Sequence, residues 1–532
     1  MEVVSARVEN GYRLEELYLT SEMTPNGPNR IFCAYARPEN PPRPVPAVLL
    51  IHGGGGHADP AGAVWWARKL RIAALYIDWS GELIPGAERY TLWRNEFRNP
   101  YTDTVRVEPD LHESMLYHVI IAGVRALDFL QTQAEVDMRW VASFGGSWGG
   151  FISLLLAGVD PRVGCVLSEF GGGGWADSFS GLACGLQSMP PDKRSRWLEV
   201  FDPIVYASRT KARVLISAAT NDYFFWLGGV QRNYEALAGY KRLVMLPNSD
   251  HGFGGPTMAD FKYQWLRRYF ASDNAWPELT PGSLHGHGNT YTWRTSGTKP
   301  IRSATLYFSP GKTVWPARYW VGIPARRDGD LWTAELPPEL ARLSGQVYAT
   351  AFDEDGMPSS SPARARCGMD PRSTPGPLWP DGMVWDRERG AEAWRPYVHK
   401  PQRVEWLAGD RLSVGPGRGA THFAVMTNSV VLASGRSSGF AGIRLKLSGN
   451  GKPGSLAARL LRDSRSTKEV AYAARVDYGA ADMEVGLPWG AFKGPEGASS
   501  LPYPFDGLAL EGDRPDGSPI TITALCLAAV YE

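Results

Sequence analysis

The pattern of hydrophobic positions divides the chain into two halves of different character. In the first half, short and fully apolar runs alternate with longer stretches whose apolar residues recur every three or four positions. Short runs of this kind are typical of buried parallel strands, and the longer period is typical of amphipathic helices. Strands are expected at 47–51, 73–78, 163–167, 214–218 and 243–246, with a long helix between 110 and 133. Residues 1–272 therefore predict one α/β unit with a mainly parallel sheet.

The second half of the chain is predicted to be all-β. Residues 273–300 are rich in proline and glycine and are expected to form a linker. Short alternating runs over residues 301–368 predict a small β-sandwich of the immunoglobulin-like kind. A second break at 370–377 precedes residues 380–532, whose short alternating strands suggest a jelly roll.

Composition and charge exclude several classes of protein. The chain has 532 residues, of which 43% are hydrophobic and 21% charged, as expected for a globular protein of several domains. Its 56 basic and 55 acidic residues nearly cancel, so no overall field favours nucleic acid or a membrane surface as a partner. The five cysteines are scattered and never in C-x-x-C spacing, which predicts buried thiols rather than a zinc site.

The first residues show no recognisable targeting signal. They lack the charged segment followed by an apolar one that marks a secretory signal, and no apolar run reaches about 18 residues. The expected compartment is therefore the cytoplasm, or the outside of the cell if a signal has been removed. The sequence leaves the oligomeric state open.

A strand-to-helix junction carries the first candidate for chemistry. The apolar Val141-Ala-Ser-Phe144 leads into Gly145-Gly-Ser-Trp-Gly149, and the apolar run Phe151-Ile-Ser-Leu-Leu-Leu156 follows. G-x-S-x-G between a strand and a helix is the pattern of a nucleophile elbow, a strained turn that exposes the serine hydroxyl. Glycines are needed there because side chains would collide with the strand or the helix. Ser147 is therefore the candidate nucleophile, and the alternative is a glycine-rich turn with a chance serine.

Two later loops carry candidates for a base and an acid. A serine nucleophile needs a base to take its proton and a carboxylate to orient that base. Asp222 follows one late predicted strand and His251 follows the next, which is the chain order of α/β-hydrolases. Glu169 and Asp250 are alternative acids. A further alternative is that these loop residues are unrelated to one another.

Two backbone segments are candidates for an oxyanion hole, which requires two N–H groups directed at the developing negative charge. Trp148, directly after the serine, is expected to provide one N–H group. The other is expected from Gly54 or Gly55, in the glycine loop that follows the strand at 47–51.

The same glycine loop also imitates a dinucleotide-binding fingerprint. Gly53-x-Gly55-x-x-Ala58 follows a strand, and Asp78 ends the next strand. This alternative does not account for the serine, aspartate and histidine described above, whereas a hydrolase accounts for all of these features. No cofactor is therefore expected.

Other aromatic, glycine and histidine residues are weaker candidates. Residues near the catalytic loops could line an acyl or sugar pocket, with a place in the core as the alternative; they are Trp65, Trp66, Tyr223, Trp226 and Phe253. Gly171-Gly-Gly-Gly174 predicts a flexible loop near the site. His285-Gly-His287 has no carboxylate or cysteine cluster nearby, so a linker loop is expected there, and no metal is expected.

These motifs together resemble the α/β-hydrolase superfamily over roughly the first half of the chain. They are His52-Gly-Gly-Gly55, Val136-Asp137, Gly145-Gly-Ser-Trp-Gly-Gly150, Thr220-Asn-Asp222 and Pro247-Asn248 with His251-Gly252. Within the superfamily they are similar to acetyl-xylan esterase-like and prolyl oligopeptidase-like hydrolases, and Thr-Asn-Asp is also similar to PhoPQ-activated pathogenicity-related proteins. The resemblance implies hydrolysis of carboxylic esters, less often of amides, through an acyl-serine. Prolyl oligopeptidases place a propeller before this part, and no such segment is visible here, which counts against a peptidase.

The last segment has a looser resemblance of its own. Its strands, such as 442–447 and 520–525, are similar to jelly rolls of carbohydrate-binding modules. Structural packing or an oligomer interface is the alternative.

The sequence as a whole predicts a serine esterase. Ser147 would attack an ester carbonyl, His251 would take its proton and later activate water, and Asp222 would orient the imidazole. The expected substrate is a small-molecule or carbohydrate ester, with a small acyl group on a carbohydrate as the preferred form. The alternatives are a general carboxylesterase, a peptidase and a non-catalytic glycan-binding protein.

Overall fold

The structure is a computed structural model, and its description covers most of the 532-residue chain. The described residues are 1–177, 186, 189–222, 224–247, 249, 251, 258–280, 282–310, 315, 318, 320–341, 344–366, 383–385, 394–396, 402–406, 412–417, 419–427, 440–462, 470–494 and 507–529.

A nine-stranded sheet forms the centre of the first half of the chain. Its strands are β1 (Glu2–Glu9), β2 (Tyr12–Thr24), β3 (Gly27–Pro38), β4 (Val45–Ile51), β5 (Ala73–Ile77), β6 (Val136–Gly146), β7 (Cys165–Glu169), β8 (Arg213–Ala219) and β9 (Lys241–Leu246). Their order is β1-β2-β3-β5-β4-β6-β7-β8-β9. The first three strands form antiparallel pairs, and β3 pairs antiparallel with β5. All pairs from β5 through β4 to β9 are parallel, so the predicted mainly parallel sheet is confirmed.

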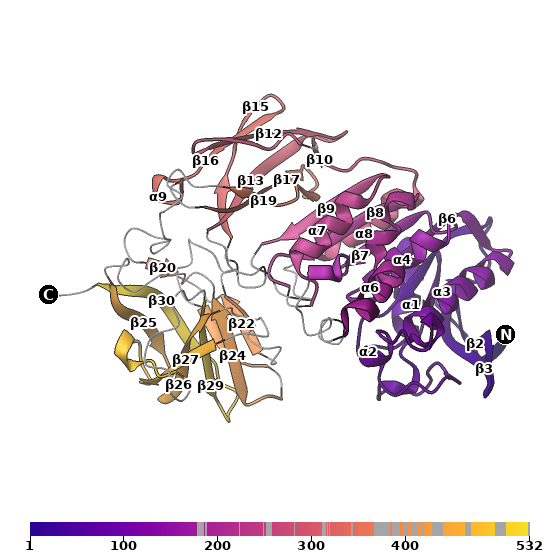
Figure 1. Ribbon diagram of the computed structural model, residues 1–532, viewed down its shortest axis with the longest axis horizontal. Helices are drawn as coiled ribbons and strands as arrows, with labels where there is room; N and C mark the ends of the chain where they lie inside the picture. The colour runs from indigo at the N-terminus through magenta and orange to yellow at the C-terminus, as the bar shows by residue number, and fades with distance from the viewer. Residues whose placement is uncertain are drawn as a thin grey trace.

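Helices cover both faces of this sheet (Figure 1). α1 (Pro60–Leu70) and α8 (Met258–Phe270) pack on one face, and α3 (Met115–Thr132), α4 (Trp148–Val159), α6 (Pro191–Phe201) and α7 (Leu227–Ala236) pack on the other. Strand β4 shows why its sequence is apolar throughout. Leu49 and Ile51 face one helical layer while Val48 and Leu50 face the other, so both sides of the strand are buried.

The parallel strands end together at one edge of the sheet. The register pairs Ile51 with Gly145, and Gly146 with Glu169 on the next strand. Glu169 in turn pairs with Ser217. Loops that follow these strands therefore meet at this edge, where open α/β sheets generally place their functional residues.

Residues 278–366 form two small sheets that face each other. One contains β10 (Glu278–Leu279), β11 (His285–His287), β12 (Thr290–Ser296), β15 (Arg326–Asp328) and β16 (Leu331–Glu335). The other contains β13 (Ile301–Pro310), β14 (Val321–Pro324), β17 (Gly345–Asp353), β18 (Pro358–Ser360) and β19 (Arg364–Arg366). A short helix, α9 (Pro338–Ala341), lies between β16 and β17. We refer to this two-sheet unit as the sandwich.

The structure differs from the linker predicted over residues 273–300. β10, β11 and β12 lie within it and belong to the sandwich. Thr290–Ser296 alternates buried and more exposed side chains along its length, which is the pattern of a half-buried strand. The prolines, glycines and His-Gly pairs just before it concealed this short alternation.

The sandwich packs tightly against the α/β unit. The Ser360 hydroxyl accepts a hydrogen bond of 3.0 Å from the backbone N–H of Met245, which places β18 beside the edge strand β9. The Trp276 indole N–H donates to the Pro358 carbonyl at 3.0 Å. Trp320 and Tyr348, both from the sandwich, are buried in the core of the α/β unit. The two units therefore share part of one hydrophobic core, to which the sandwich contributes these two rings.

The described residues from 383 onward form two further sheets, seen farthest from the N-terminus in Figure 1. One contains β20 (Met383–Trp385), β22 (Gln402–Trp406), β23 (Leu412–Pro416), β25 (Phe440–Ser448), β28 (Met483–Pro488) and β30 (Ile520–Ala529). The other contains β21 (Trp394–Pro396), β24 (His422–Thr427), β26 (Gly454–Arg462), β27 (Val470–Tyr478) and β29 (Gly507–Asp513). The jelly roll and the immunoglobulin-like topology stay predictions. Among the described helices, none has the length and apolar character needed to span a membrane.

Candidate active site

Ser147 occupies a sharp turn between β6 and α4. Its backbone has φ 57° and ψ −122°, a combination that residues with a side chain rarely adopt. The turn depends on the two flanking glycines. A Cβ added to Gly145 would lie 2.3 Å from the carbonyl carbon of Gly149, and one added to Gly149 would lie 2.0 Å from the carbonyl oxygen of Ile51. The serine hydroxyl is thus held at the end of the strand by a turn that only glycine neighbours allow.

Ser147, His251 and Asp222 are joined by hydrogen bonds in one row. The distance from His251 Nε2 to the Ser147 Oγ is 2.9 Å. His251 Nδ1 lies 2.8 Å from Oδ2 of Asp222. Because the carboxylate can only accept, Nδ1 carries the proton and Nε2 is left to accept from the serine hydroxyl. The structure therefore brings together the three residues that the sequence predicted, from loops far apart in the chain.

The Asp222 carboxylate is fixed from both sides. Its Oδ1 accepts hydrogen bonds from the backbone N–H groups of Phe224 and Phe225, at 2.7 and 2.9 Å. Its Oδ2 accepts from the imidazole, and the side chain is only 2% exposed. A buried carboxylate with every oxygen occupied keeps one orientation, and it can stabilise an imidazolium next to it.

Of the two alternative acids, Glu169 does not take this place. Glu169 accepts the backbone N–H of Ser147 with its main-chain carbonyl at 2.7 Å, while its side-chain carboxylate forms an ion pair with Lys262. Asp250 lies outside the described residues. Asp222 is the acid that contacts His251 in the described ion pairs.

Aromatic rings surround the imidazole of His251. Phe224 lies 5.0 Å from it between ring centroids, Phe225 lies 5.9 Å away in a stacked arrangement, and Phe170 lies 6.1 Å away. The histidine side chain is 16% exposed. Rings on several sides reduce the contact of the imidazole with water, and electrostatic interactions are stronger where water is displaced.

Three backbone N–H groups beside the serine have no hydrogen-bond acceptor in the described part of the chain. They belong to Gly54, Gly55 and Trp148. Trp148 is the first residue of α4, so its N–H lies at the positive end of the helix. A Cβ added to the adjacent Gly53 would lie 3.3 Å from the Ser147 Cβ, which shows how close the glycine loop comes to the nucleophile. These are the donors predicted for an oxyanion hole.

His52 orients the peptide that carries the Gly54 N–H. Its Nδ1 donates to the Gly53 carbonyl at 2.8 Å, and the N–H of Gly56 donates to the same oxygen at 3.2 Å. Because the C=O and N–H of a trans peptide point in opposite directions, the Gly54 N–H faces away from His52. The ring is itself fixed by the backbone N–H of Trp79, which lies 3.1 Å from Nε2.

Asp78 lies behind this loop rather than in a cofactor site. It is fully buried and accepts from the backbone N–H groups of Gly81 and Thr91, at 3.1 and 2.7 Å. Burial alone would raise the pKa of Asp78, but the imidazole of His52, the N–H of Thr91 and the imidazole of His57 bring it below its ordinary value. A carboxylate occupied in this way is not available to a ribose hydroxyl, which counts against the dinucleotide alternative.

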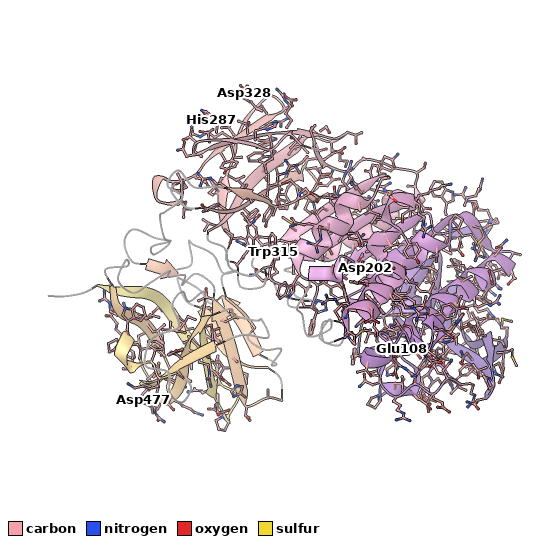
Figure 2. The ribbon with its side chains drawn as sticks, in the orientation of Figure 1. Glu108, Asp202, His287, Trp315, Asp328 and Asp477 are labelled. Carbon is pink, nitrogen blue, oxygen red and sulfur yellow. The ribbon has the colours of Figure 1, made fainter. Side chains whose placement is uncertain are left out.

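The glycine loop at 171–174 is close-packed, which corrects the prediction of a flexible loop. A Cβ on Gly171 would lie 2.6 Å from the carbonyl oxygen of Ser147, and one on Gly173 would lie 2.2 Å from Oδ1 of Asp202. Asp202, labelled in Figure 2, accepts from the N–H groups of Gly174 and Trp175 at 2.8 Å each. Burial raises the pKa of Asp202 despite these donors. The glycines let this loop support the nucleophile turn from behind.

Tyr101 is a site residue that sequence reasoning missed. It lies on the short helix α2 (Pro100–Asp103), whose N-terminus is capped by the Asn99 side chain. A Cβ on Gly54 would lie 3.1 Å from the Tyr101 ring and 3.4 Å from its hydroxyl. The ring is 36% exposed and covers the glycine loop. The Asn-Pro pair at 99–100 is a helix-start signal, but nothing in the sequence indicates where the tyrosine points.

The predicted pocket residues are only partly placed. Trp66 packs against Phe144 in the core on the α1 face of the sheet. Trp65 packs edge-on against Trp66 and is 52% exposed. Trp226 is buried just before α7. Tyr223 and Phe253 lie outside the described residues. We assign no substrate contact to the two tryptophans of α1.

The described residues contain no group of three or more side chains that could hold a metal ion. His285 and His287 are exposed on β11, one of the sandwich strands.

Comparisons with known proteins agree with this fold. A family model described as PhoPQ-activated pathogenicity-related protein matches residues 180–309, a stretch that includes Asp222 and His251. Acetyl esterase Axe7A of Xylanibacter ruminicola is 33% identical over 112 residues, which are 20% of this chain and 26% of that protein. Dipeptidyl aminopeptidase BIII of Pseudoxanthomonas mexicana is 23% identical over 231 residues, 40% of this chain and 31% of that protein.

Solved structures include an acetyl xylan esterase from Paenibacillus sp. R4. It is 23% identical, with a TM-score of 0.42, and the match covers 50% of this chain and 87% of that one. The chain spans less than a third of the length of the two curated relatives. The strand order, the turn at Ser147 and these relatives together define the first half of the chain as an α/β-hydrolase fold. Its relatives are of the acetyl-xylan esterase-like and prolyl oligopeptidase-like kinds, as the sequence predicted.

Proposed function

We propose that the protein is a serine hydrolase of carboxylic esters, in which Ser147 is the nucleophile, His251 the proton carrier and Asp222 the orienting acid. The observation that carries the proposal is the uninterrupted row of hydrogen bonds from Ser147 through His251 to Asp222. The unoccupied N–H groups of Trp148 and Gly54 or Gly55 lie beside it.

Acylation would use each of these groups once. The Ser147 Oγ attacks the ester carbonyl carbon while its proton passes to His251 Nε2. The carbonyl oxygen becomes negative and accepts hydrogen bonds from the N–H groups of the glycine loop and Trp148. When the tetrahedral intermediate collapses, the C–O bond to the alcohol breaks, and His251 gives the alcohol its proton.

Deacylation would repeat the sequence with water. His251 takes a proton from a water molecule, which attacks the acyl carbon, and the oxyanion forms again in the same place. Collapse breaks the bond to the Ser147 Oγ, and the serine recovers its proton from His251. The products are the free carboxylic acid and the regenerated enzyme. Every step uses residues of this chain.

The proposed substrate is a carbohydrate that carries a small acyl group such as acetate. The acetyl esterase relative supports a short acyl chain. The rings of Trp148 and Tyr101 also lie close to Gly54, at 2.9 and 3.1 Å from the position that a Cβ would take there, which favours a small acyl group. The peptidase relative makes amide hydrolysis the second candidate.

The first experiment measures hydrolysis of p-nitrophenyl acetate, butyrate and octanoate. We expect the wild type to prefer acetate, and Ser147→Ala to lose at least a thousandfold in kcat, as in other serine hydrolases. Ser153→Ala is the matched control, because Ser153 also lies on α4 but its hydroxyl accepts a hydrogen bond from Ser143 in the core, at 2.9 Å. Equal activity of Ser147→Ala and the wild type would refute the proposal.

The second experiment identifies the substrate class. Release of acetate from acetylated xylan is compared with release of p-nitroaniline from a dipeptide p-nitroanilide. We expect the first reaction and not the second. Cleavage of the anilide with no release of acetate would favour the peptidase instead.

A further inference from the structure

Asn221, the residue before the orienting acid, joins three parts of the molecule. Its side chain is fully buried. Its Nδ2 donates to the main-chain carbonyl of Arg318 in the sandwich, and its Oδ1 accepts from the Thr220 hydroxyl at 2.9 Å. Its backbone N–H donates to the carbonyl of Ser249 at 3.0 Å, two residues before His251. One residue thus links the acid turn, the histidine loop and the sandwich.

Trp315, Arg318 and Trp320 pack closely within the sandwich and against the α/β unit. Arg318 is 5% exposed, and its guanidinium lies 5.0 Å from the centre of the Trp315 ring. Figure 2 shows Trp315 where the sandwich meets the α/β unit. Trp320 is 1% exposed and packs edge-on against Tyr348, with ring centroids 4.8 Å apart. We refer to Trp315, Arg318 and Trp320 as the bridging residues.

Trp315 also reaches the other side of the acid turn. A Cβ added to Gly228, in the first turn of α7, would lie 2.4 Å from the Trp315 Nε1. That turn follows Phe224 and Phe225 closely in sequence, and their N–H groups hold Oδ1 of Asp222. The bridging residues therefore contact the segments before and after the acid.

We propose that Asn221 is a positioning residue, through which the bridging residues of the sandwich hold Asp222 and His251 in register. A buried amide without an acceptor is unfavourable, and the carbonyl of Arg318 in the sandwich is an acceptor for the buried Asn221 amide. The inference rests on the proposed function, since it assigns a task within the same row of hydrogen bonds.

Loss of this link has a specific consequence for the imidazole. Among the described ion pairs, Asp222 is the charged partner of His251. A displaced carboxylate stabilises the imidazolium less, so the imidazole would lose its proton at lower pH. It would also hold the tautomer needed to accept the serine proton less well. A change that merely reduced the amount of folded protein would alter neither property.

The test measures covalent labelling of Ser147 by an alkyl fluorophosphonate from pH 5 to 9. The Ser147 Oγ bonds to phosphorus, the P–F bond breaks, fluoride leaves and His251 takes the serine proton. For Asn221→Ala in the full chain, we expect the labelling rate constant to fall about tenfold to a hundredfold, as for a mispositioned catalytic group. The acidic limb of the pH profile of this rate constant should shift to lower pH by roughly one unit.

Ser360→Ala is the matched control. It removes another hydrogen bond between the two units, from Met245 N–H to the Ser360 hydroxyl at 3.0 Å, but far from the acid turn in sequence. We expect its rate constant and pH profile to equal those of the wild type. An equal loss in both variants would show a general effect of loosening the interface and would overturn the assignment to Asn221.

The remaining outcomes separate the two proposals. If the wild type is labelled at Ser147, but Asn221→Ala has the same labelling rate constant and the same pH profile as the wild type, the further inference fails while the proposed function stands. If the wild type is not labelled at all, the proposed function fails. If Asn221→Ala does not fold, Gly228→Ala replaces it, because the added methyl group displaces Trp315. For Gly228→Ala we then expect a smaller labelling rate constant and an acidic limb shifted to lower pH. An unchanged pH profile would overturn the inference.

Discussion

Asp222 uses its two carboxylate oxygens for different purposes. One oxygen accepts two backbone N–H groups and fixes the side chain, and the other accepts the imidazole. An asparagine side chain has only one acceptor oxygen. Its NH₂ group would therefore have to face either the two backbone N–H groups or the imidazole N–H, and neither can accept a hydrogen bond.

We therefore expect Asp222→Asn to lower kcat by about a thousandfold to ten-thousandfold at pH 7, through the wrong imidazole tautomer. KM for p-nitrophenyl acetate should change much less. Steady-state kinetics on protein of verified folding would check this. Activity within tenfold of the wild type would mean that another acid serves His251.

Tyr101 allows a prediction about substrate binding. Its ring lies against Gly54, and the residue is partly exposed. We expect Tyr101→Ala to raise KM for p-nitrophenyl acetate by about tenfold, the effect of losing roughly 1.4 kcal/mol of binding, with a smaller change in kcat. Tyr101→Phe keeps the ring and serves as the control for the hydroxyl. Wild-type kinetics of the alanine variant would exclude the tyrosine from the binding site.

At the level of residues, the sequence predicted those with a chemical pattern and missed those without one. Ser147, Asp222 and His251 follow strands in a known order, so they could be named before the structure was known. Tyr101 could not, because it lies in a polar and irregular stretch where spacing carries no information on side-chain direction. The sequence showed Asn221 as part of the Thr220-Asn-Asp222 motif, but it gave no sign of its contact with Arg318, which lies 97 residues further along the chain.

The connection after β5 acts as a scaffold for the glycine loop. The buried Asp78 carboxylate fixes the backbone of Gly81 and Thr91, and the next residue, Trp79, fixes His52. These contacts keep the Gly53–Gly54 peptide in the orientation described above.

The lowered pKa of Asp78 predicts a pH dependence of stability. Its folded-state pKa lies below the ordinary value of about 3.9. The stabilisation is therefore fully present above about pH 4 and is lost as pH falls through the lower folded-state pKa. We expect Asp78→Asn to reduce the free energy of unfolding by about 3 kcal/mol at pH 7, and by less at pH 3. Urea unfolding at both pH values would check this, and an equal difference at both would contradict it.

Elements were predicted well where the hydrophobic period was long and uninterrupted. The five apolar runs became β4, β5, β7, β8 and β9, and the helical period over 110–133 became α3. The errors fell on glycine-rich segments. Proline and glycine around residue 280 concealed the strands β10 to β12, and Gly171-Gly-Gly-Gly174 suggested freedom where the glycines instead allow close packing. Glycine is common both in flexible loops and in segments that pack closely, and only tertiary contacts distinguish the two.

The α/β unit and the sandwich are joined by backbone and side-chain contacts. β18 lies along β9, the last strand of the large sheet, and Trp320 and Tyr348 complete the core of the α/β unit. The sandwich thereby covers an edge strand that would otherwise offer unpaired backbone groups for aggregation.

We expect a fragment of residues 1–272 to be poorly soluble and to bind a dye specific for exposed apolar surface. The full chain should instead show a single thermal transition for these two units. Size-exclusion chromatography and calorimetry would check both expectations. A monomeric fragment with the thermal stability of the full chain would show that the shared core contributes little.

The backbone at Ser147 has a consequence for the molecule as a whole. Its dihedral angles are ones that glycine adopts freely and serine does not, and such strain generally amounts to about 1–3 kcal/mol. Glycine loses more chain entropy on folding, which offsets part of this. We expect Ser147→Gly to be inactive yet more resistant to urea than the wild type, by about 1 kcal/mol. Such a result would mean that selection has kept a less durable protein for the sake of one exposed hydroxyl.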